Sequence, residues 1–247
     1  MAVQTKGKCK YCGKEYTKTY MLRHLSACKE KKIPAAGSKK CNYFELAIYG
    51  RYDKTYWLIV EICEDALLKD LDSFLRAIWL ECCGHLSSFN INGVSYESVP
   101  VEGLFWGEPA ENMNHKLKTL FTKGMKMDYV YDYGSSTDLI IDVHDYREGE
   151  RRKEKVTILS RNIPPRILCS ECQEKEAVMI CMECYWENKG FLCRDCLQTH
   201  ECEEGMLLAV CNSPRMGVCA YEGSDFYPEE FVPDTKNIKK VLAKSKK

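Results

Sequence analysis

The sequence predicts an α+β fold, with one medium-sized sheet domain and a small cysteine-rich module on each side of it. Hydrophobic residues alternate with polar ones over much of the segment from about residue 43 to residue 160, as in strands. One helical periodicity interrupts this alternation. Half of the 16 cysteines occur as Cys-x-x-Cys pairs before or after this segment. A chain of 247 residues has room for one core and small appendages.

The first module is predicted from four residues with the spacing of metal ligands. A tetrahedral zinc site takes four thiolate or imidazole ligands, and a Cys-x-x-Cys turn supplies two of them. A helix from about Thr19 would place the second two, which are four residues apart, on one face. Residues 1–30 therefore resemble a single zinc finger in which a hairpin packs on a helix. The four candidate ligands are Cys9, Cys12, His24 and Cys28.

Charge is distributed unevenly, although the net charge is zero. Residues 1–40 contain 11 Lys and Arg against 2 Asp and Glu, whereas residues 41–160 contain 13 against 20. The basic end is a candidate contact for nucleic-acid phosphates. The alternative is that zinc only folds a segment too short to bury a core. Residues 31–41 are expected to be a flexible basic linker. The candidate phosphate contacts are Lys10, Lys14, Lys18 and Arg23.

The sheet domain is predicted to begin with a hairpin and a helix. Phe44, Leu46 and Ile48 alternate with other residues, and the same period recurs from Tyr56 to Ile62. Leucine, isoleucine and tryptophan then recur at helical spacing, which predicts a helix over about residues 67–81 that ends near Gly84.

A second hairpin follows the helix, because Asn92-Gly93 lies between short apolar runs. Hairpin, helix and hairpin in this order predict a β-grasp-like sheet with the helix across one face. A short helix at 115–121 and strands at 127–133, 139–143 and 156–158 would complete a domain spanning residues 42–162.

Four stretches of this domain follow one another in a distinctive order: WLIVEI (57–62), LKDLDSFLRAIW (68–79), HLSSF (85–89) and YVYDYGSSTDLIIDV (129–143). They resemble the plasmid pRiA4b ORF-3-like family, which is also described as transposon passenger or TnpR-like. Where the family carries two acidic residues before its His-Leu motif, this chain has Cys82 and Cys83. The family's Tyr-Asp-Phe-Gly-Asp-x-Trp-x-His signature corresponds to residues 131–139, where its second Asp, its Trp and its His are replaced. The resemblance implies a prokaryotic protein linked to mobile elements, and it brings no established activity.

Cys82 and Cys83 with His85 form the one constellation in the domain that could provide a nucleophilic thiol. This gives the alternative hypothesis of a thiol-dependent enzyme or redox protein. Adjacent residues usually point to different sides of the chain, and a buried cysteine packs like a small hydrophobic residue. A structural role is therefore the favoured interpretation.

The C-terminal module, residues 166–222, is predicted from three Cys-x-x-Cys pairs with eight residues between successive pairs. The spacing resembles the cross-braced B-box and MYND-type modules, in which the first and third pairs share one zinc. The second pair would then use His200 and one more thiol, for which Cys202 is favoured over Cys219 and Cys211 is left free. A sequential pairing stays open. The three pairs are Cys169 and Cys172, Cys181 and Cys184, and Cys193 and Cys196.

Together these patterns predict about three structural zinc ions, since every site is filled by protein ligands. The expected function is that of a non-enzymatic adaptor that binds a protein partner, with nucleic acid as a further candidate partner through residues 1–40. The apolar residues of the C-terminal module, Trp186 among them, are expected in its small core, with a surface for a protein partner as the alternative. Residues 223–247 are expected to form a basic tail. The sequence shows no long apolar run and no signal-peptide pattern, so a cytoplasmic protein without membrane contact is expected.

Overall fold

The computed structural model describes residues 4–31, 37, 39–100 and 110–227. Contacts divide the chain into two compact units, which are treated separately. The first, here called the sheet unit, comprises Met1–Arg76 with His85–Ile163. The second, the C-terminal unit, comprises Ala77–Gly84 with Pro164–Lys247. The expected 1–30 module thus groups with the sheet. Most of the predicted 31–41 linker lies outside the described residues, as do residues 228–247 of the predicted 223–247 tail.

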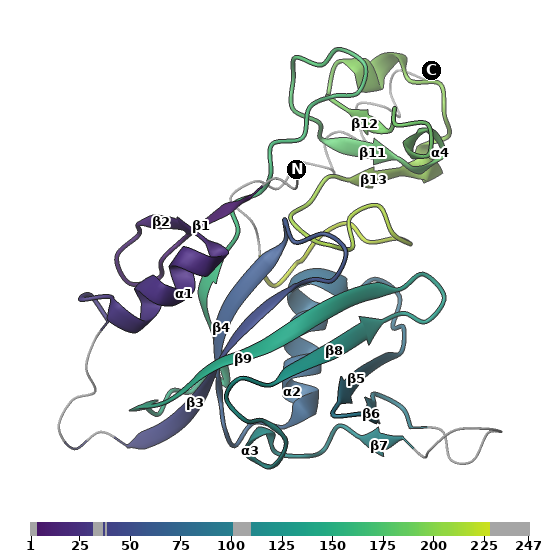
Figure 1. Ribbon diagram of the computed structural model, residues 1–247. Coiled ribbons are helices and arrows are strands. Elements are labelled where there is room, and N and C mark those ends of the chain that lie inside the picture. Colours follow the sequence, from purple (N-terminus) through teal and green to yellow (C-terminus); the bar gives the residue numbers. More distant parts are fainter. Residues whose placement is uncertain (1–3, 32–36, 38, 101–109, 228–247) are drawn as a thin grey trace. The chain divides into compact units, whose positions relative to one another are not determined.

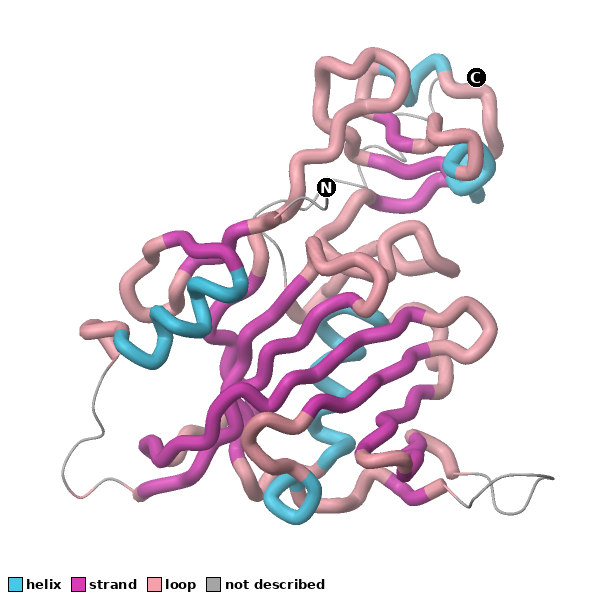
Figure 2. Tube along the Cα trace, in the orientation of Figure 1, coloured by secondary structure: helices cyan, strands magenta, loops and turns pink. Residues whose placement is uncertain are grey.

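The sheet unit is a mixed α/β structure that consists mostly of sheet (Figures 1 and 2). Its strands follow the order β10-β4-β3-β9-β8-β5-β6-β7, and neighbours are antiparallel except for the parallel pair β6 and β7. The strands are β3 (Lys40–Gly50), β4 (Trp57–Cys63), β5 (Ser87–Ile91), β6 (Val94–Glu97), β7 (Glu111–Asn112), β8 (Lys126–Tyr131), β9 (Thr137–Glu150) and β10 (Val156–Arg161).

The predicted first hairpin and helix are present. β3 pairs with β4, with Leu46 opposite Val60. Helix α2 (Leu68–Leu75) follows and continues as a π-helical turn, η1 (Arg76–Leu80). Asp70 begins the helix by accepting a hydrogen bond from the backbone N–H of Leu67 (2.8 Å). Asp72 on α2 accepts a buried hydrogen bond from the Tyr129 hydroxyl of β8 (2.7 Å), so α2 covers the sheet face that carries Tyr129.

The second predicted hairpin is also present, with Asn92 and Gly93 in the left-handed region at φ 52° and 86°. The short helix α3 (Leu117–Leu120) precedes β8. Tyr129 and Tyr131 of β8 are fully buried and belong to the core, whereas Tyr133 beyond the strand is half exposed. The β-grasp-like arrangement stays a prediction.

The N-terminal finger, residues 4–31, packs against the opposite face of the same sheet. It consists of β1 (Lys6–Lys8), β2 (Glu15–Thr17) and α1 (Lys18–Ala27). Side chains alternate between faces along a strand, so Trp57 and Ile59 point away from the face that carries Val60. These two residues form a hydrophobic cluster with Met21 and Leu25 of α1. Both faces of β3 and β4 are therefore covered, and nearly every residue of β3 is buried.

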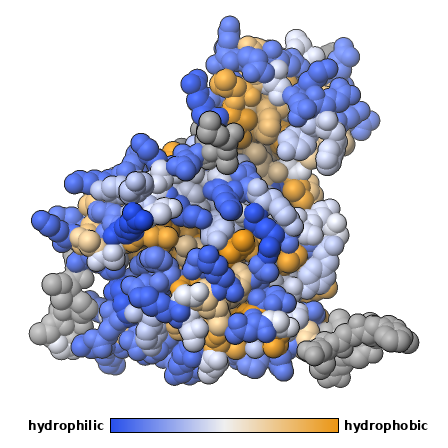
Figure 3. Space-filling model, in the orientation of Figure 1, coloured by the Kyte–Doolittle hydropathy of each residue, from blue (hydrophilic) through white to orange (hydrophobic). Residues whose placement is uncertain are grey.

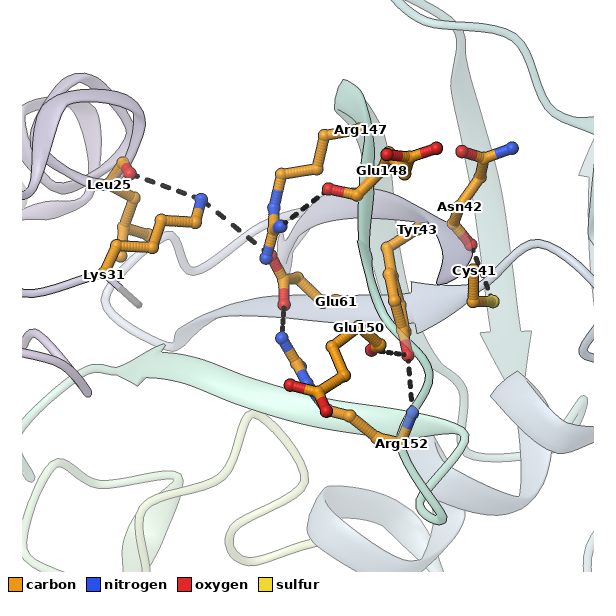
Figure 4. Close-up of polar contacts among 10 residues, drawn as sticks. All are labelled: Leu25, Lys31, Cys41, Asn42, Tyr43, Glu61, Arg147, Glu148, Glu150 and Arg152. Atoms are coloured by element: carbon orange, nitrogen blue, oxygen red, sulfur yellow. Dashed lines mark hydrogen bonds and ion pairs between the residues drawn. The ribbon is translucent and has the colours of Figure 1, made fainter. Parts of the chain in front are cut away.

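Buried charges also connect the finger to the sheet, as Figure 4 shows. Glu61 of β4 is fully buried, and Arg147, Arg152 and Lys31 surround its carboxylate. The Arg147 Nε donates to it at 2.6 Å, Arg152 lies at 2.8 Å and Lys31 at 3.9 Å. Lys31 also donates to the backbone carbonyl of Leu25 in α1 (3.4 Å). Lys31, at the end of the finger, is therefore part of an ion cluster whose centre is Glu61 of the sheet.

The C-terminal unit contains a three-stranded sheet and short helical turns. The strand order is β12-β11-β13, and two small hydrophobic clusters flank the sheet. Gly190 is required beside β11, because a Cβ there would lie 2.7 Å from the backbone carbonyl of Cys181. The elements are β11 (Met179–Cys181), α4 (Met182–Tyr185), β12 (Phe191–Leu192), the 3-10 turns η2 (Cys196–Thr199) and η3 (Glu204–Met206), and β13 (Leu207–Ala209).

Candidate metal centres

The finger brings its four predicted ligands together. Cys9 and Cys12 lie in the turn between β1 and β2, His24 lies on α1 and Cys28 follows it. Their ligand atoms all lie within 4.8 Å of one another. The Cys9 and Cys28 sulfurs are 4.0 Å apart, and the Cys12 sulfur is 3.2 Å from Nε2 of His24. Gly13, at φ 72°, closes the turn by donating its N–H to the Cys9 carbonyl (2.8 Å).

Two further groups lie in the C-terminal unit, and their pairing is the cross-braced one. The first and third Cys-x-x-Cys pairs form one group, and the second pair lies with His200 and Cys202. The sequential pairing is therefore not the observed one, and Cys202 rather than Cys219 accompanies His200. The two groups are Cys169, Cys172, Cys193 and Cys196, and Cys181, Cys184, His200 and Cys202.

Distances between sulfurs agree with what a shared zinc ion would need. Two Zn–S bonds of about 2.3 Å at the tetrahedral angle place their sulfurs about 3.8 Å apart. Cys172 and Cys193 are separated by 3.9 Å, and Cys184 and Cys202 by 3.5 Å. The Cys41 and Cys63 sulfurs are only 2.6 Å apart and belong to no such group. The criterion thus distinguishes candidate ligands from other close thiols.

The electrostatics of these groups favour a cation at their centre. Burial raises the pKa of the Cys169 thiol, but hydrogen bonds from the backbone N–H groups of Cys172 and Cys193 outweigh it and lower that pKa to about 7. Cys196 in the same group has its pKa raised to about 12, first by a hydrogen bond with Cys193. Neighbouring thiolates repel one another, so the whole group ionises only when a metal compensates the charge.

The arrangement fits structural zinc better than catalytic zinc. Each of these three groups offers four side chains, which fill a tetrahedral coordination sphere. A catalytic site would keep one position open for water or substrate. These groups can fix loops and strand ends, and they offer no activated water.

A fourth group was not expected from the sequence. Cys82, Cys83, His85 and Cys219 also have ligand atoms within 4.8 Å of one another. The expectation that the two adjacent cysteines point apart is wrong, because the chain bends at residues 82–83 and Gly84 is at φ 75°. The one available hint was that Cys219 lies in a Pro/Gly-rich turn, which is able to fold back onto a distant segment.

The alternative of a thiol-dependent enzyme receives no support from Cys83. Hydrogen bonds with Cys219 and then Cys82 raise the pKa of Cys83 to about 11. A nucleophilic cysteine needs the opposite shift, because the thiolate is the reactive species. The His85 Nε2 lies 3.6 Å from the carboxylate of Asp132, and the ring packs edge-on against Tyr131.

The four predicted nucleic-acid contacts differ in their exposure. Lys10, Lys14 and Arg23 are exposed. Lys18 instead packs over the Tyr49 ring, with Nζ 3.2 Å from its centroid, and burial lowers its pKa to about 8. Lys18 differs from the other three residues because it lies on the first turn of α1, above the sheet.

Comparisons with known proteins give little further information. No model of a protein family matches the sequence, and no curated protein matches it significantly. One solved structure with some similarity is the protein of unknown function MM3350 from Methanosarcina mazei Go1. The match has 18% identity and a TM-score of 0.43, and it covers 49% of this chain and 70% of that one. Among the described residues, no helix has both the length and the apolar character needed to cross a membrane.

Proposed function

We propose that the chain is a non-enzymatic zinc protein that binds a basic segment of a protein partner through its C-terminal unit. The observation that carries this proposal is the closed set of four protein ligands in each of the three predicted sites. Such zinc ions hold a surface in place rather than transform a substrate. The choice of binding partner then depends on the side chains that this surface exposes.

An exposed aromatic pair lies next to one of the ligand groups. Tyr185 ends α4 and Trp186 follows it, one and two residues after the ligand Cys184. The Trp186 side chain is 82% exposed, so its expected place in the core is wrong. The short α4 lets this residue extend away from the cluster formed by β11 and β13. Tryptophan and tyrosine contribute much of the binding energy in protein interfaces.

Charge indicates the chemistry of the partner. Residues 166–222 contain 5 Lys and Arg against 10 Asp and Glu, a balance of −5. Glu187, next to Trp186, is largely exposed and forms an ion pair with the equally exposed Lys189 (3.7 Å). A segment with Lys or Arg would be attracted by this charge, and its cations could stack on the tryptophan ring. Figure 3 shows hydrophilic residues over much of the displayed face, with hydrophobic patches between them.

Selection from a random peptide library against the zinc-loaded full chain tests this proposal. We expect enrichment of Lys- and Arg-rich peptides whose affinity falls about tenfold or more in Trp186→Ala, since truncation of an anchor costs about 2 kcal/mol. Tyr52→Ala, which removes an 85% exposed aromatic side chain of the sheet unit, is the matched control and should bind as the wild type does. Peptides without basic residues, or equal losses in both variants, would contradict the proposal.

A second candidate is nucleic-acid contact through the finger. Lys6 and Lys8 on β1 and the following Lys10 are all exposed, while the intervening Gly7 and Cys9 are buried. These lysines form a basic row that is compatible with a phosphate backbone, as a mobile-element accessory protein of the pRiA4b ORF-3-like type would use. Binding to double-stranded DNA should then weaken steeply with salt and disappear in Lys6→Gln/Lys8→Gln/Lys10→Gln. Salt-independent binding, or none at low salt, would exclude this candidate.

A further inference from the structure

The fourth thiol group lies outside the three predicted sites and is built from two distant segments. Cys82 and Cys83 belong to the segment Ala77–Gly84, and Cys219 lies in the loop of residues 213–224. All three thiols are part of the C-terminal unit, so their proximity does not depend on where the two units lie.

We propose that the three thiols of Cys82, Cys83 and Cys219 bind a fourth zinc ion, which clasps the 213–224 loop and exchanges more readily than the other three. The proposal does not depend on peptide binding by the C-terminal unit. It rests on the geometry of the thiols, the anchoring of the loop, the adjacent buried cation and the exposure of the ligands.

The geometry agrees with that of the other groups. The Cys83 and Cys219 sulfurs are 3.6 Å apart, close to the value of about 3.8 Å for two thiolates on one zinc ion. The group therefore satisfies the criterion that Cys41 and Cys63 fail at 2.6 Å. Three thiolates supply three of the four ligands that tetrahedral zinc takes.

Side chains of the loop hold it against the segment that carries the first two thiols. The Ser213 hydroxyl donates to the backbone carbonyl of Trp79 (2.7 Å), and the Ser224 hydroxyl donates to that of Ala77 (2.5 Å). Between these anchors, Cys219 adopts a left-handed conformation at φ 54°. This conformation is unfavourable for a residue with a Cβ, and such strain is often found at functional sites. The loop thus presents the Cys219 thiol in a fixed position.

Arg215 gives the site an electrostatic reason to bind a metal–thiolate complex. Its side chain is fully buried, and Nη2 donates to the Cys82 sulfur at 3.4 Å. Burial of a cation is costly unless negative charge lies nearby. Zinc with three thiolates carries one net negative charge, which complements the guanidinium.

Exposure distinguishes this group from the other three. Cys83 and Cys219 are exposed, and Cys82 is half-buried. Each of the other groups has at least one fully shielded thiol, such as Cys9, Cys169 or Cys181. Water and competing ligands therefore reach the fourth ion more easily, so it would be the first to leave when free zinc becomes scarce.

Native mass spectrometry of the full chain, purified under reducing conditions with zinc, tests the stoichiometry. We expect one ion for each of the four groups in the wild type and one fewer in Cys219→Ser. Cys63→Ser, which changes a thiol outside the four groups, is the control and should keep the full number. Three ions in the wild type, or an unchanged number in Cys219→Ser, would overturn the proposal. A mass about 2 Da lower, from a Cys83–Cys219 disulfide, would also overturn it.

Two kinetic measurements test the clasp itself. Transfer of zinc to a colorimetric chelator should show one rapid equivalent in the wild type and in Cys63→Ser, and that phase should be missing in Cys219→Ser. Trypsin should also cleave after Arg215 at least tenfold faster in Cys219→Ser, because release of the loop exposes a side chain that is now fully buried. A rapid phase that persists without Cys219, or unchanged cleavage, would contradict the proposal. Loss of peptide binding in Trp186→Ala would not be affected by either result.

Discussion

The finger and the C-terminal unit contain the same kind of Cys/His group, which could hold a metal ion, but they differ in the hydrophobic core around it. In the finger, Met21 and Leu25 are completely buried against Trp57 and Ile59 of the sheet. In the C-terminal unit, short strands carry two small clusters around which the ligands are arranged. A module that shares the core of a larger sheet has hydrophobic burial in addition to its metal. One that has only small clusters depends on the metal for its fold.

Complete removal of zinc should have the largest effect and should separate the two regions. Structural zinc contributes about 10 kcal/mol or more per site in isolated fingers, which exceeds what small clusters supply. With a strong chelator we expect NMR amide signals of residues 164–227 to collapse to unfolded positions. Signals of β3, β4, β8 and β9 should persist, because that core contains no ligand.

Re-addition of zinc provides the control for this experiment. The C-terminal signals should return to their original positions, since the thiols are not expected to form disulfides under reducing conditions. If the signals of the sheet collapse together with those of residues 164–227, the two regions depend on zinc to the same degree.

The spacing of cysteines carried most of the information about the ligand groups. Cys-x-x-Cys turns are local, so twelve of the thirteen predicted ligands fall in the expected groups. Cys219 differs because its neighbours in space, Cys82 and Cys83, are more than 130 residues away in the chain. No periodicity encodes such a contact, which depends on serine anchors in the 213–224 loop.

Docking of the finger was also not predictable from alternation alone. Glu45 and Glu61 occupy alternate strand positions, which a sequence pattern assigns to a solvent-exposed face. Both are buried, since the finger covers that face. Trp57 and Ile59 on the same face were an available indication, because large apolar residues there require a cover.

Loss of the buried ion cluster in the sheet unit should have the next largest effect on stability. Glu61→Gln leaves Arg147 and Arg152 without their shared carboxylate, and breaking a buried pair typically costs about 3–5 kcal/mol. Urea unfolding with zinc in excess measures this change. Glu148→Gln is the control, because its ion pair with Lys40 is exposed and should contribute less than about 1 kcal/mol. Equal effects would show that the cluster does not hold this face.

A smaller effect, with a definite pH dependence, is expected at Glu45. Burial raises the pKa of this carboxyl from 4.5 to about 7, so the folded protein holds the proton more tightly than the unfolded chain. Stability from this group is present below about pH 4.5 and is lost as the pH rises to about 7. At pH 8 the wild type therefore carries a cost of up to about 3 kcal/mol that Glu45→Gln removes.

Urea unfolding of both proteins between pH 5.5 and 8 tests this expectation. Protonation of the zinc ligands affects the two proteins equally, so their difference isolates Glu45. The variant should become more stable than the wild type as the pH increases. A difference that is independent of pH would contradict the burial of an ionisable carboxyl beneath the finger.

The smallest expected effect is that of a single methyl group where the finger contacts the sheet. Gly7 of β1 forms a bridge with Asn162, and the next residue, Lys8, is exposed. A Cβ on Gly7 would lie 2.6 Å from Cη2 of Trp57 and would also meet the backbone carbonyl of Arg161. Gly7→Ala should therefore cost about 1–3 kcal/mol through overpacking, even with zinc in excess.

Gly134→Ala is the matched control within the same unit, because its Cβ would meet only Asp132 at an ordinary contact distance of 3.5 Å. Zinc stoichiometry should be the same in both variants, since neither glycine is a ligand. If Gly7→Ala weakens the finger while the metal stays bound, close packing on the sheet contributes to its stability independently of zinc. If the free energy of unfolding is unchanged, packing on the sheet adds nothing to the stability of the finger. The finger would then depend on its metal alone, as the C-terminal unit does.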